Sequence, residues 1–393
     1  MRRILLLAVI TILFLAAATA CAPREADTIK IGCVLSLSGE LGPKGKERLM
    51  AARLAVEEIN AEGGVLDKNL QLVEKDDATD ADKCLEQVQK MASADGVQAL
   101  IGGMSSGAAV ATGPYLAEKS VVMISPSATA PPISDYAWTG WFFRTVPNDA
   151  FQGRILARII LEKGYIKLAT IVPANAYGQG LEIALVDELK KNGWSGKHTL
   201  QIYYDPAQND YSAELKNIKN SNPDVILAVT YVEDGIKIFS QALELGLDEI
   251  PWLGCDGNYG DSMFVDKQCA EFMEKAIIAG TRFAGPLAGA TYDTFAAAYK
   301  DFTGSDPGLY CETTYDAVKM LALAIEKAGV YDGTAVKDAL LDIGQGYTGA
   351  SGTITFDNKG NRITGIYEIW DVIEADTAES GYRNIRTEII RID

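Results

Sequence analysis

The hydrophobic pattern along the chain predicts alternating strands and helices. Residues 28–36 form an unbroken, β-branched apolar run, which is typical of a strand covered on both faces of a sheet. After a predicted loop at 38–45, apolar residues recur at helical spacing from Leu49 to Ile59, and Gly63 and Gly64 end that helix. Further strands are predicted at 69–76, 97–101 and 121–124, with helices between them. This order indicates right-handed βαβ units and a parallel sheet.

The same pattern restarts after residue 147. A helix is predicted over 149–163. Strands separated by helical segments follow at 167–172, 200–204, 224–230, 250–254 and 276–281. The chain has 393 residues, which is too long for one ordinary hydrophobic core. The restart therefore marks a second lobe.

The last quarter of the chain has a different pattern. Helices are predicted at 291–302, 310–328 and 334–341. Residues 353–357 and 363–372 are predicted to form a hairpin around a glycine-containing turn, and a final strand at 386–392 is expected to pair nearby. The three helices cannot bury their apolar stripes alone, so we expect them to return to the first lobe.

The predicted fold class is α/β, with two doubly wound parallel-sheet lobes joined by a multi-strand hinge. The first lobe is predicted to comprise residues 28–147 and 282–352, and the second to comprise 148–281 and 353–393. A chain that crosses between lobes more than once forms a hinge rather than a tether.

The N-terminus has the features of an export signal. A basic start at Arg2 and Arg3 is followed by an apolar stretch that ends in small residues before Cys21, which predicts a signal peptide over 1–20. The Ala-Ala-Thr-Ala-Cys ending resembles the bacterial lipoprotein cleavage box. We therefore expect a lipid on Cys21, a linker over 21–27, and a protein anchored at the outer face of the cytoplasmic membrane. An uncleaved anchor and a plain signal peptide are the alternatives.

Charge and composition exclude several classes of function. A net charge of −17 without a basic stretch argues against a nucleic-acid partner. His198 is the only histidine, which argues against histidine-based metal sites and a Ser-His-Asp hydrolase. There is also no dinucleotide-binding fingerprint. We expect no metal, no cofactor and no catalysis.

Cysteine usage leaves the pairing open. Disulfides are permitted in an exported protein, but the five cysteines beyond Cys21 are an odd number. They are Cys33, Cys84, Cys255, Cys269 and Cys311. The pair Cys255 and Cys269 is the first to test.

Two loops rich in small hydroxyl residues follow neighbouring predicted strands, at residues 101–107 and 124–130. Ligands of open α/β sheets bind outside the carboxyl ends of the strands. Free backbone amides and hydroxyls at such a point suit a carboxylate. One such loop is most simply the start of a helix, whereas two consecutive loops favour a binding site.

Taken together, eight segments resemble the branched-chain amino-acid binding proteins of ABC importers, which have the type I periplasmic-binding fold. The segments are 54–64, 76–78, 101–106, 124–131, 143–145, 176–180, Tyr310 with 315–318, and 352–357. They span essentially the whole mature chain, in the family's order and spacing. The resemblance implies a monomer whose lobes, joined by a three-strand hinge, close over one small ligand and hand it to a membrane permease.

The resemblance also implies roles at the carboxylate end of the ligand. Ser106 and Thr129 would hold the α-carboxylate through hydroxyl and backbone N–H groups. Backbone groups of Met104 and Ser127 would add contacts to the amino-acid moiety.

In the second lobe, the resemblance implies an acid that binds the ligand ammonium. The alignment favours Asp234, with Glu233 as the near alternative. From the residues alone, a helix N-cap is nearly as good an interpretation of Asp234. Tyr177 would pack over the ligand, and Asp256 sits at a strand end that faces the cleft.

Two positions depart from the family. Thr79 and Ser105 occupy both positions of the family's disulfide beside the carboxylate loop, and Ser105 remains a candidate ligand contact. Lys44 stands where relatives often place an aromatic residue over the side-chain pocket. A solvated loop lysine is the simple interpretation, but an inward Lys44 would favour a polar or acidic ligand.

The leading hypothesis is a solute-binding lipoprotein that captures an amino acid or similar small carboxylate and delivers it to an ABC importer. The alternative is a sensor of the same fold that acts on a signalling partner. An envelope enzyme is the third candidate, and the missing nucleophile and metal motifs argue against it.

Overall fold

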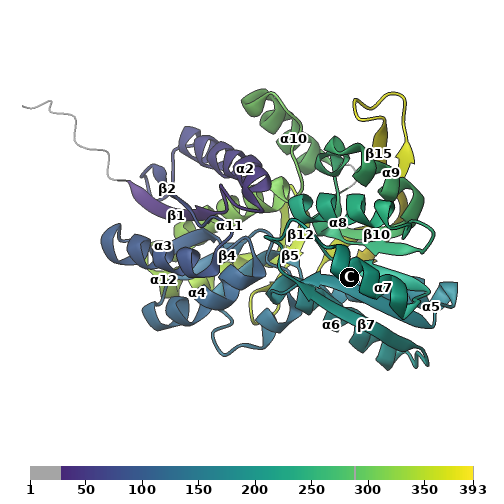
Figure 1. Ribbon diagram of the computed structural model, residues 1–393. Helices are drawn as coiled ribbons and strands as arrows, with labels where there is room; N and C mark the ends of the chain where they lie inside the picture. Colours follow the sequence, from purple (N-terminus) through teal and green to yellow (C-terminus); the bar gives the residue numbers. More distant parts are fainter. Residues whose placement is uncertain (1–27, 287–288, 393) are drawn as a thin grey trace, which may run out of the picture.

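The computed structural model describes residues 28–286 and 289–392, and it consists of two α/β lobes side by side (Figure 1). The predicted signal peptide and Cys21 lie outside the described residues. The fold class agrees with the sequence prediction, because each lobe has its own sheet with helices packed on it.

The first lobe is built on a parallel sheet in the order β13-β5-β4-β3-β1-β2. Its strands are β1 (Ile29–Leu35), β2 (Leu70–Asp76), β3 (Ala99–Gly102), β4 (Val122–Ser125), β5 (Phe142–Pro147) and β13 (Asn361–Arg362). Its helices are α2 (Gly42–Ala61), α3 (Ala81–Ala94), α4 (Ser106–Lys119), the short η1 (Pro131–Asp135), α10 (Ala290–Thr303), α11 (Cys311–Ala328) and α12 (Gly333–Ile343).

The second lobe is built on a mixed sheet in the order β15-β14-β10-β9-β8-β6-β7. Its strands are β6 (Lys167–Pro173), β7 (Lys197–Tyr204), β8 (Val225–Ala228), β9 (Trp252–Gly254), β10 (Ile277–Ala284), β14 (Gly365–Glu374) and β15 (Tyr382–Ile392). Its helices are α5 (Ala150–Lys163), α6 (Ala176–Lys191), α7 (Ser212–Ser221), α8 (Val232–Glu244), the short η2 (Asp256–Asn258) and η3 (Asp261–Val265), and α9 (Lys267–Ala276).

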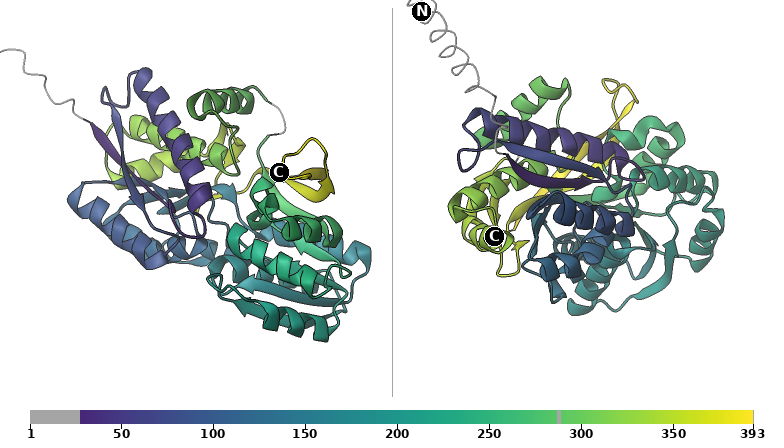
Figure 2. Two further views of the ribbon diagram at one scale, coloured as in Figure 1. Left: turned by 45° about the horizontal axis from the view of Figure 1, so that its top comes forward. Right: turned by 90° about the vertical axis from the view of Figure 1, so that its left-hand side faces the viewer.

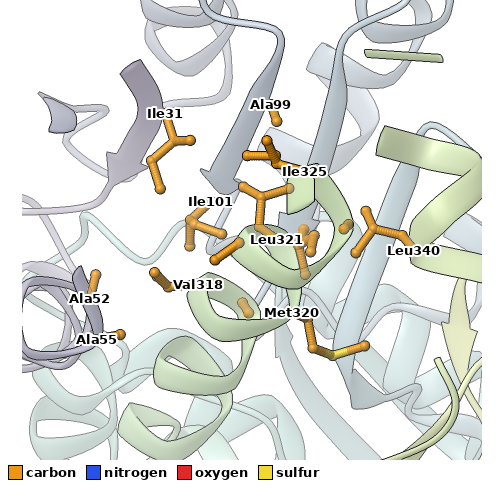
Figure 3. Packing of buried hydrophobic residues seen from close by; sticks show 14 of the residues in the cluster. Ile31, Ala52, Ala55, Ala99, Ile101, Val318, Met320, Leu321, Ile325 and Leu340 are labelled. Carbon is orange, nitrogen blue, oxygen red and sulfur yellow. The ribbon is translucent and has the colours of Figure 1, made fainter. Parts of the chain in front are cut away.

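The late helices pack on the first lobe. Val318, Leu321 and Ile325 of α11 lie against Ile31 of β1 and Ile101 of β3 in one buried cluster (Figure 3). This packing covers the apolar stripe of α11. None of the helices in the described part of the chain is both long and apolar enough to cross a membrane.

The chain crosses between the lobes after β5, after β10 and after β13, and the last crossing differs from the prediction. Strand β12 (Gly352–Thr355) pairs with β11 (Gln345–Gly349), and β13 pairs with β5, so residues 353–362 stay with the first lobe. Buried Arg362 donates hydrogen bonds to the backbone oxygens of Thr145 and Ser351, which ties this segment down.

The predicted hairpin over 353–372 is confirmed only at its turn, where the Ile363 N–H donates to the Thr355 backbone oxygen over 2.9 Å and Phe356 forms an antiparallel bridge with Arg362. Strand β14 instead pairs antiparallel with β10 and β15 in the second lobe, where the C-terminal hairpin, coloured yellow, projects (Figure 2, left). The predicted pairing of the final strand with a neighbour is confirmed.

Helix α2 begins inside the predicted loop. Pro43 lies in its first turn, where a missing N–H costs nothing because the helix has no acceptor for it. A Cβ at Gly45 would overlap the backbone oxygen of Ser36, so glycine lets the helix approach the end of β1. The earlier start places Lys44 and Arg48 on one helix, one turn apart.

The five described cysteines are all buried and free, so the candidate pair of Cys255 and Cys269 is wrong. Cys255 packs in the cluster that contains Tyr177, whereas Cys269 packs in another cluster beside Met273. The two thiols therefore lie in different hydrophobic clusters of the second lobe.

Candidate functional site

A small cavity of about 50 Å³ lies between the two lobes, and it shares lining residues with a wider opening of about 660 Å³ beside it. The first lobe lines it with Glu40, Leu41, Lys44, Arg48, Met104, Ser105, Ser106, Ser127, Leu309 and Tyr310, and the second with Tyr177, Tyr231, Val232, Asp256 and Gly257. Several of these residues directly follow β3, β8 and β9, at the carboxyl ends where α/β sheets bind ligands.

The two serine-rich loops meet at this cavity. Ser105 is the N-cap of α4, and its Oγ accepts a hydrogen bond from the Ala108 N–H over 3.1 Å. Ser106 Oγ accepts from the Ala130 N–H of the other loop over 3.1 Å. Ser105 and Ser106 therefore begin a helix at the cavity wall, where the helix dipole favours an anion.

Ser127 joins the same two loops and also a third element. Its Oγ donates to the backbone oxygen of Met104 over 3.0 Å and accepts from Arg48 Nη1 over 2.9 Å. Thr129, in contrast, is 2% exposed and is not among the residues that line the cavity. Its backbone oxygen accepts from the Asp149 N–H.

Asp256 supplies the carboxylate of the opposite wall. It is 5% exposed and accepts from Tyr177 OH over 2.7 Å, from Tyr310 OH over 2.8 Å and from Gln152 Nε2 over 3.0 Å. The Tyr177 ring stacks on Tyr231 with centroids 5.5 Å apart. These contacts fix the orientation of the carboxylate and of the aromatic wall beside it.

Asp149, which the sequence reasoning missed, lies behind Asp256. Gln152 Nε2 donates to both carboxyl groups. Complete burial, and then the charge of Asp256, raise the pKa of Asp149 to about 8. The raised pKa favours the protonated form of Asp149 beside Asp256.

Asp234 is held by its own helix terminus. Its carboxylate is fully buried and accepts from the Tyr231 N–H over 3.0 Å and from Tyr204 OH. The sequence offered Asp234 as a helix N-cap, whereas the structure places Tyr231 at the N-cap of α8 and Asp234 at the third helical position, where it caps the Tyr231 N–H. Burial raises its pKa to about 6. Asp234 does not line the cavity, whereas Glu233 is exposed and lines a wider opening next to it.

Lys44 faces the cavity rather than solvent. Its Nζ donates to the backbone oxygen of Tyr259 across the lobes over 3.3 Å. Burial, and then the charge of Arg48, lower its pKa to about 8. The helical start at Gly42 brings Lys44 inward.

Arg48 was missed because the sequence reasoning treated its helix turn only as apolar core. It is 2% exposed, and its Nε donates to the backbone oxygen of Leu309 over 3.3 Å. Its guanidinium lies 5.1 Å from the centroid of the Tyr310 ring. The spacing of four residues from Lys44 was the available signal, because such residues share a helix face.

Glu40 lies at the boundary between the cavity and the wider opening. Its pKa is raised to about 7 by burial and then by the negative charges of Asp234, Asp205 and Glu233. A cation placed beside it would lower that pKa again. The first lobe therefore lines the site with cations, hydroxyls and Glu40, and the second lobe adds the carboxyl group of Asp256, so groups of both charges are available to a zwitterion.

No cluster of three or more metal-ligating residues occurs in residues 28–286 and 289–392. His198 lies on β7, where its ring nitrogen is 3.0 Å from Thr170 Oγ1, and it is not among the residues that line the cavity.

The chain matches known proteins over most of its length. The periplasmic binding protein family model matches residues 28–376. The Leu/Ile/Val-binding protein BraC3 of Rhizobium johnstonii is 29% identical over 349 residues, which cover 88% of this chain and 92% of BraC3.

Two solved structures have the same fold. The branched-chain amino acid transporter substrate binding protein LivJ of Streptococcus pneumoniae, in complex with isoleucine, is 25% identical. The match has a TM-score of 0.76 and covers 92% of this chain and all of LivJ. The leucine binding protein LivK of Thermotoga maritima is 23% identical, with a TM-score of 0.80, and the match covers 92% of this chain and 98% of LivK. The chain therefore belongs to the periplasmic binding protein family and has the type I fold of its branched-chain amino-acid binding members.

Proposed function

We propose that this protein is an extracytoplasmic solute-binding protein that captures an amino acid or a similar small carboxylate between its lobes and delivers it to an ABC importer. The observation that carries the proposal is the cavity between the lobes, where the hydroxyls and cations of the first lobe face Asp256 of the second lobe and Glu40 lies at the rim. A small zwitterion matches both walls at once.

The carboxylate of the ligand would bind at the start of α4. Ser105 and Ser106 offer hydroxyls and free N–H groups there, and Ser127 and the backbone of Met104 complete the wall. Arg48 adds a positive charge at the same loops. Thr129 would act from behind the wall by holding its loop against Asp149.

The ammonium of the ligand would bind between Asp256 and Glu40, under the ring of Tyr177. Asp234 would contribute indirectly, because it holds the N–H of Tyr231, whose ring stacks on Tyr177. Charge-assisted hydrogen bonds of this kind contribute about 1.5–3 kcal/mol each.

The cellular context follows from the N-terminus. We propose that residues 1–20 are a signal peptide, that a lipid on Cys21 anchors the protein at the outer face of the membrane, and that the anchored protein is a monomer. Relatives are named for binding leucine, isoleucine and valine, so amino acids are the first ligands to test.

Isothermal titration calorimetry of the mature chain against amino acids and small carboxylates tests the proposal. We expect at least one ligand to bind with micromolar or better affinity. Asp256→Asn should weaken the binding of amine-bearing ligands about tenfold or more. A charge-assisted hydrogen bond contributes about 1.5–3 kcal/mol, and a tenfold change in affinity corresponds to about 1.4 kcal/mol. The control Asp187→Asn changes an exposed carboxylate on α6 and should leave binding unchanged. Failure of every amino acid and carboxylate to bind would overturn the proposal.

A further inference from the structure

Two cationic side chains of α2 reach the cavity without an acidic partner. Among the described residues, neither Lys44 nor Arg48 forms an ion pair. Arg48 donates only to neutral acceptors, the Leu309 backbone oxygen and Ser127 Oγ, and its Nη2 has no hydrogen-bond partner in the described structure. Lys44 donates only to the backbone oxygen of Tyr259.

This arrangement is costly without a counter-charge. A buried charge is unfavourable unless it is paired and hydrogen-bonded. Arg48 is 2% exposed, and Lys44, one turn away on the same face, repels it. Asp256 is nearby but already accepts hydrogen bonds from Tyr177, Tyr310 and Gln152. Glu47 and Glu312 act on Arg48 through space without forming an ion pair, so a ligand carboxylate would be its first directly bound counter-charge.

We propose that the cavity selects a ligand with two carboxylate groups, one bound by Arg48 together with the serine loops and the second bound by Lys44. Acidic amino acids and small dicarboxylates share this chemistry. The inference rests on the proposed function and narrows it, because it assigns the specificity of the same site.

The geometry places the two anionic groups at different depths. Arg48 is hydrogen-bonded to Ser127, so the ligand carboxylate that Arg48 binds lies at the serine loops. Lys44 lines both the cavity and the wider opening, so the second carboxylate lies nearer the mouth. An apolar ligand side chain would leave Lys44 desolvated and unpaired.

Calorimetry at pH 7 with L-glutamate, L-glutamine, glutarate and L-leucine tests this inference. Glutamate and glutamine have nearly the same shape, so the ratio of their affinities reports the effect of the side-chain carboxylate alone. We expect glutamate to bind at least tenfold more tightly than glutamine and leucine. Glutarate then separates the two sources: binding close to that of glutamate indicates a dicarboxylate, and much weaker binding indicates an acidic amino acid.

Substitutions locate the effect. Lys44→Met should reduce the ratio of glutamate affinity to glutamine affinity to about one, mainly through weaker glutamate binding. Arg48→Gln should lower the affinities for glutamate and for glutamine at least tenfold. Lys46→Met, on the exposed face of α2, should change neither. Lys44→Met needs no change in the buried core, so the test stands even if Arg48→Gln unfolds.

Each contrary outcome has a distinct meaning. Leucine or glutamine binding as tightly as glutamate would overturn this inference and leave the proposed function intact. A glutamate preference that survives Lys44→Met would overturn the role of Lys44. Absence of binding by all four compounds and by every other carboxylate would overturn both proposals together.

Discussion

The hydroxyl of Tyr310 donates a hydrogen bond to Asp256 Oδ2 over 2.8 Å and thereby joins the first lobe to the second. Tyr310 precedes α11, and its ring lies against the guanidinium of Arg48. Asp256 follows β9 and also accepts from Tyr177. The carboxylate of Asp256 thus bridges Tyr310, which packs on Arg48 in the first lobe, and Tyr177 in the second lobe.

Tyr310→Phe should remove this link while keeping the ring on Arg48. We expect the ligand affinity to fall about three- to tenfold, mainly through faster dissociation, because a lost hydrogen bond to a charged group costs about 1.5–3 kcal/mol and part of that is recovered by water. Stopped-flow dissociation measures the effect. Tyr331→Phe removes a hydroxyl that donates to the backbone oxygen of Lys30 and does not line the cavity. This control should leave the dissociation rate unchanged. Equal dissociation rates for the two variants would show that the hydrogen bond between Tyr310 and Asp256 does not control ligand release.

Lys44 should take up a proton when a dicarboxylate binds. Its pKa is lowered to about 8, so below pH 8 it is mostly charged and between pH 8 and 10 it is mostly neutral in the free protein. A ligand carboxylate favours the charged form and raises that pKa, so binding at pH 8.5–9 takes up protons. Calorimetry in buffers of different ionisation enthalpy measures the uptake, which Lys44→Met should abolish. The charged groups that act on Lys44 are Arg48, Glu47, Asp256 and Arg282.

Glu40 should release a proton when an amine-bearing ligand binds, which is the opposite of the proton uptake expected at Lys44. Its pKa is raised to about 7, so a large fraction is protonated at pH 6.5 in the free protein. A ligand ammonium stabilises the carboxylate, so binding at pH 6–7 releases protons, and Glu40→Gln should remove the release. The groups that act on Glu40 are Asp234, Asp205, Glu233 and Lys237. Proton release that persists in Glu40→Gln would assign the ammonium to another acid.

The raised pKa of Glu40 also links folding to pH. The folded protein binds this proton more tightly than the unfolded chain, so the contribution of Glu40 to stability is present below pH 4.5 and is lost as the pH rises to about 7. Glu40→Gln should therefore flatten the fall in stability of the ligand-free protein between pH 4.5 and 7. Thermal unfolding across that range measures the difference.

Asp234→Ala should affect stability more than ligand binding. The substitution leaves the Tyr231 N–H and the Tyr204 hydroxyl buried without their acceptor, which costs about 1–3 kcal/mol. We expect a lower free energy of unfolding in urea and a ligand affinity within about threefold of the parent. Asp256→Asn is the matched comparison, with the reverse pattern expected. Loss of binding in Asp234→Ala, with an unchanged free energy of unfolding, would return the ammonium role to Asp234.

Cys21→Ala should prevent lipid attachment. In a bacterial host that processes lipoproteins, a labelled fatty acid should enter the parent protein and not the variant, and the variant should leave the membrane fraction. Cys33→Ala changes a buried thiol of β1 and should keep the label. Label in the Cys21 variant would contradict anchoring at this residue.

The residue pattern alone determined the local elements and the region of the site. Strand β1 and helix α11 follow from apolar runs and helical spacing, because side-chain periodicity is a local property of the backbone. The serine-rich loops were identified as a site because the carboxyl ends of neighbouring parallel strands meet at one edge of a sheet. Cys255 and Cys269 illustrate the limit, since no local pattern tells which cluster a buried thiol joins.

Only the tertiary structure decided which side chains face the cavity between the lobes. The close approach of α2 to β1 at Gly45 lengthens the helix and turns Lys44 and Arg48 into the cavity. Tyr204 at the end of β7 donates a hydrogen bond to Asp234 of α8, which does not line the cavity, whereas Asp256 accepts a hydrogen bond from Tyr310 across the lobes. These two hydrogen bonds join residues that are 30 and 54 positions apart. The direction of a side chain over such separations depends on how whole elements pack, and a sequence pattern describes only the element itself.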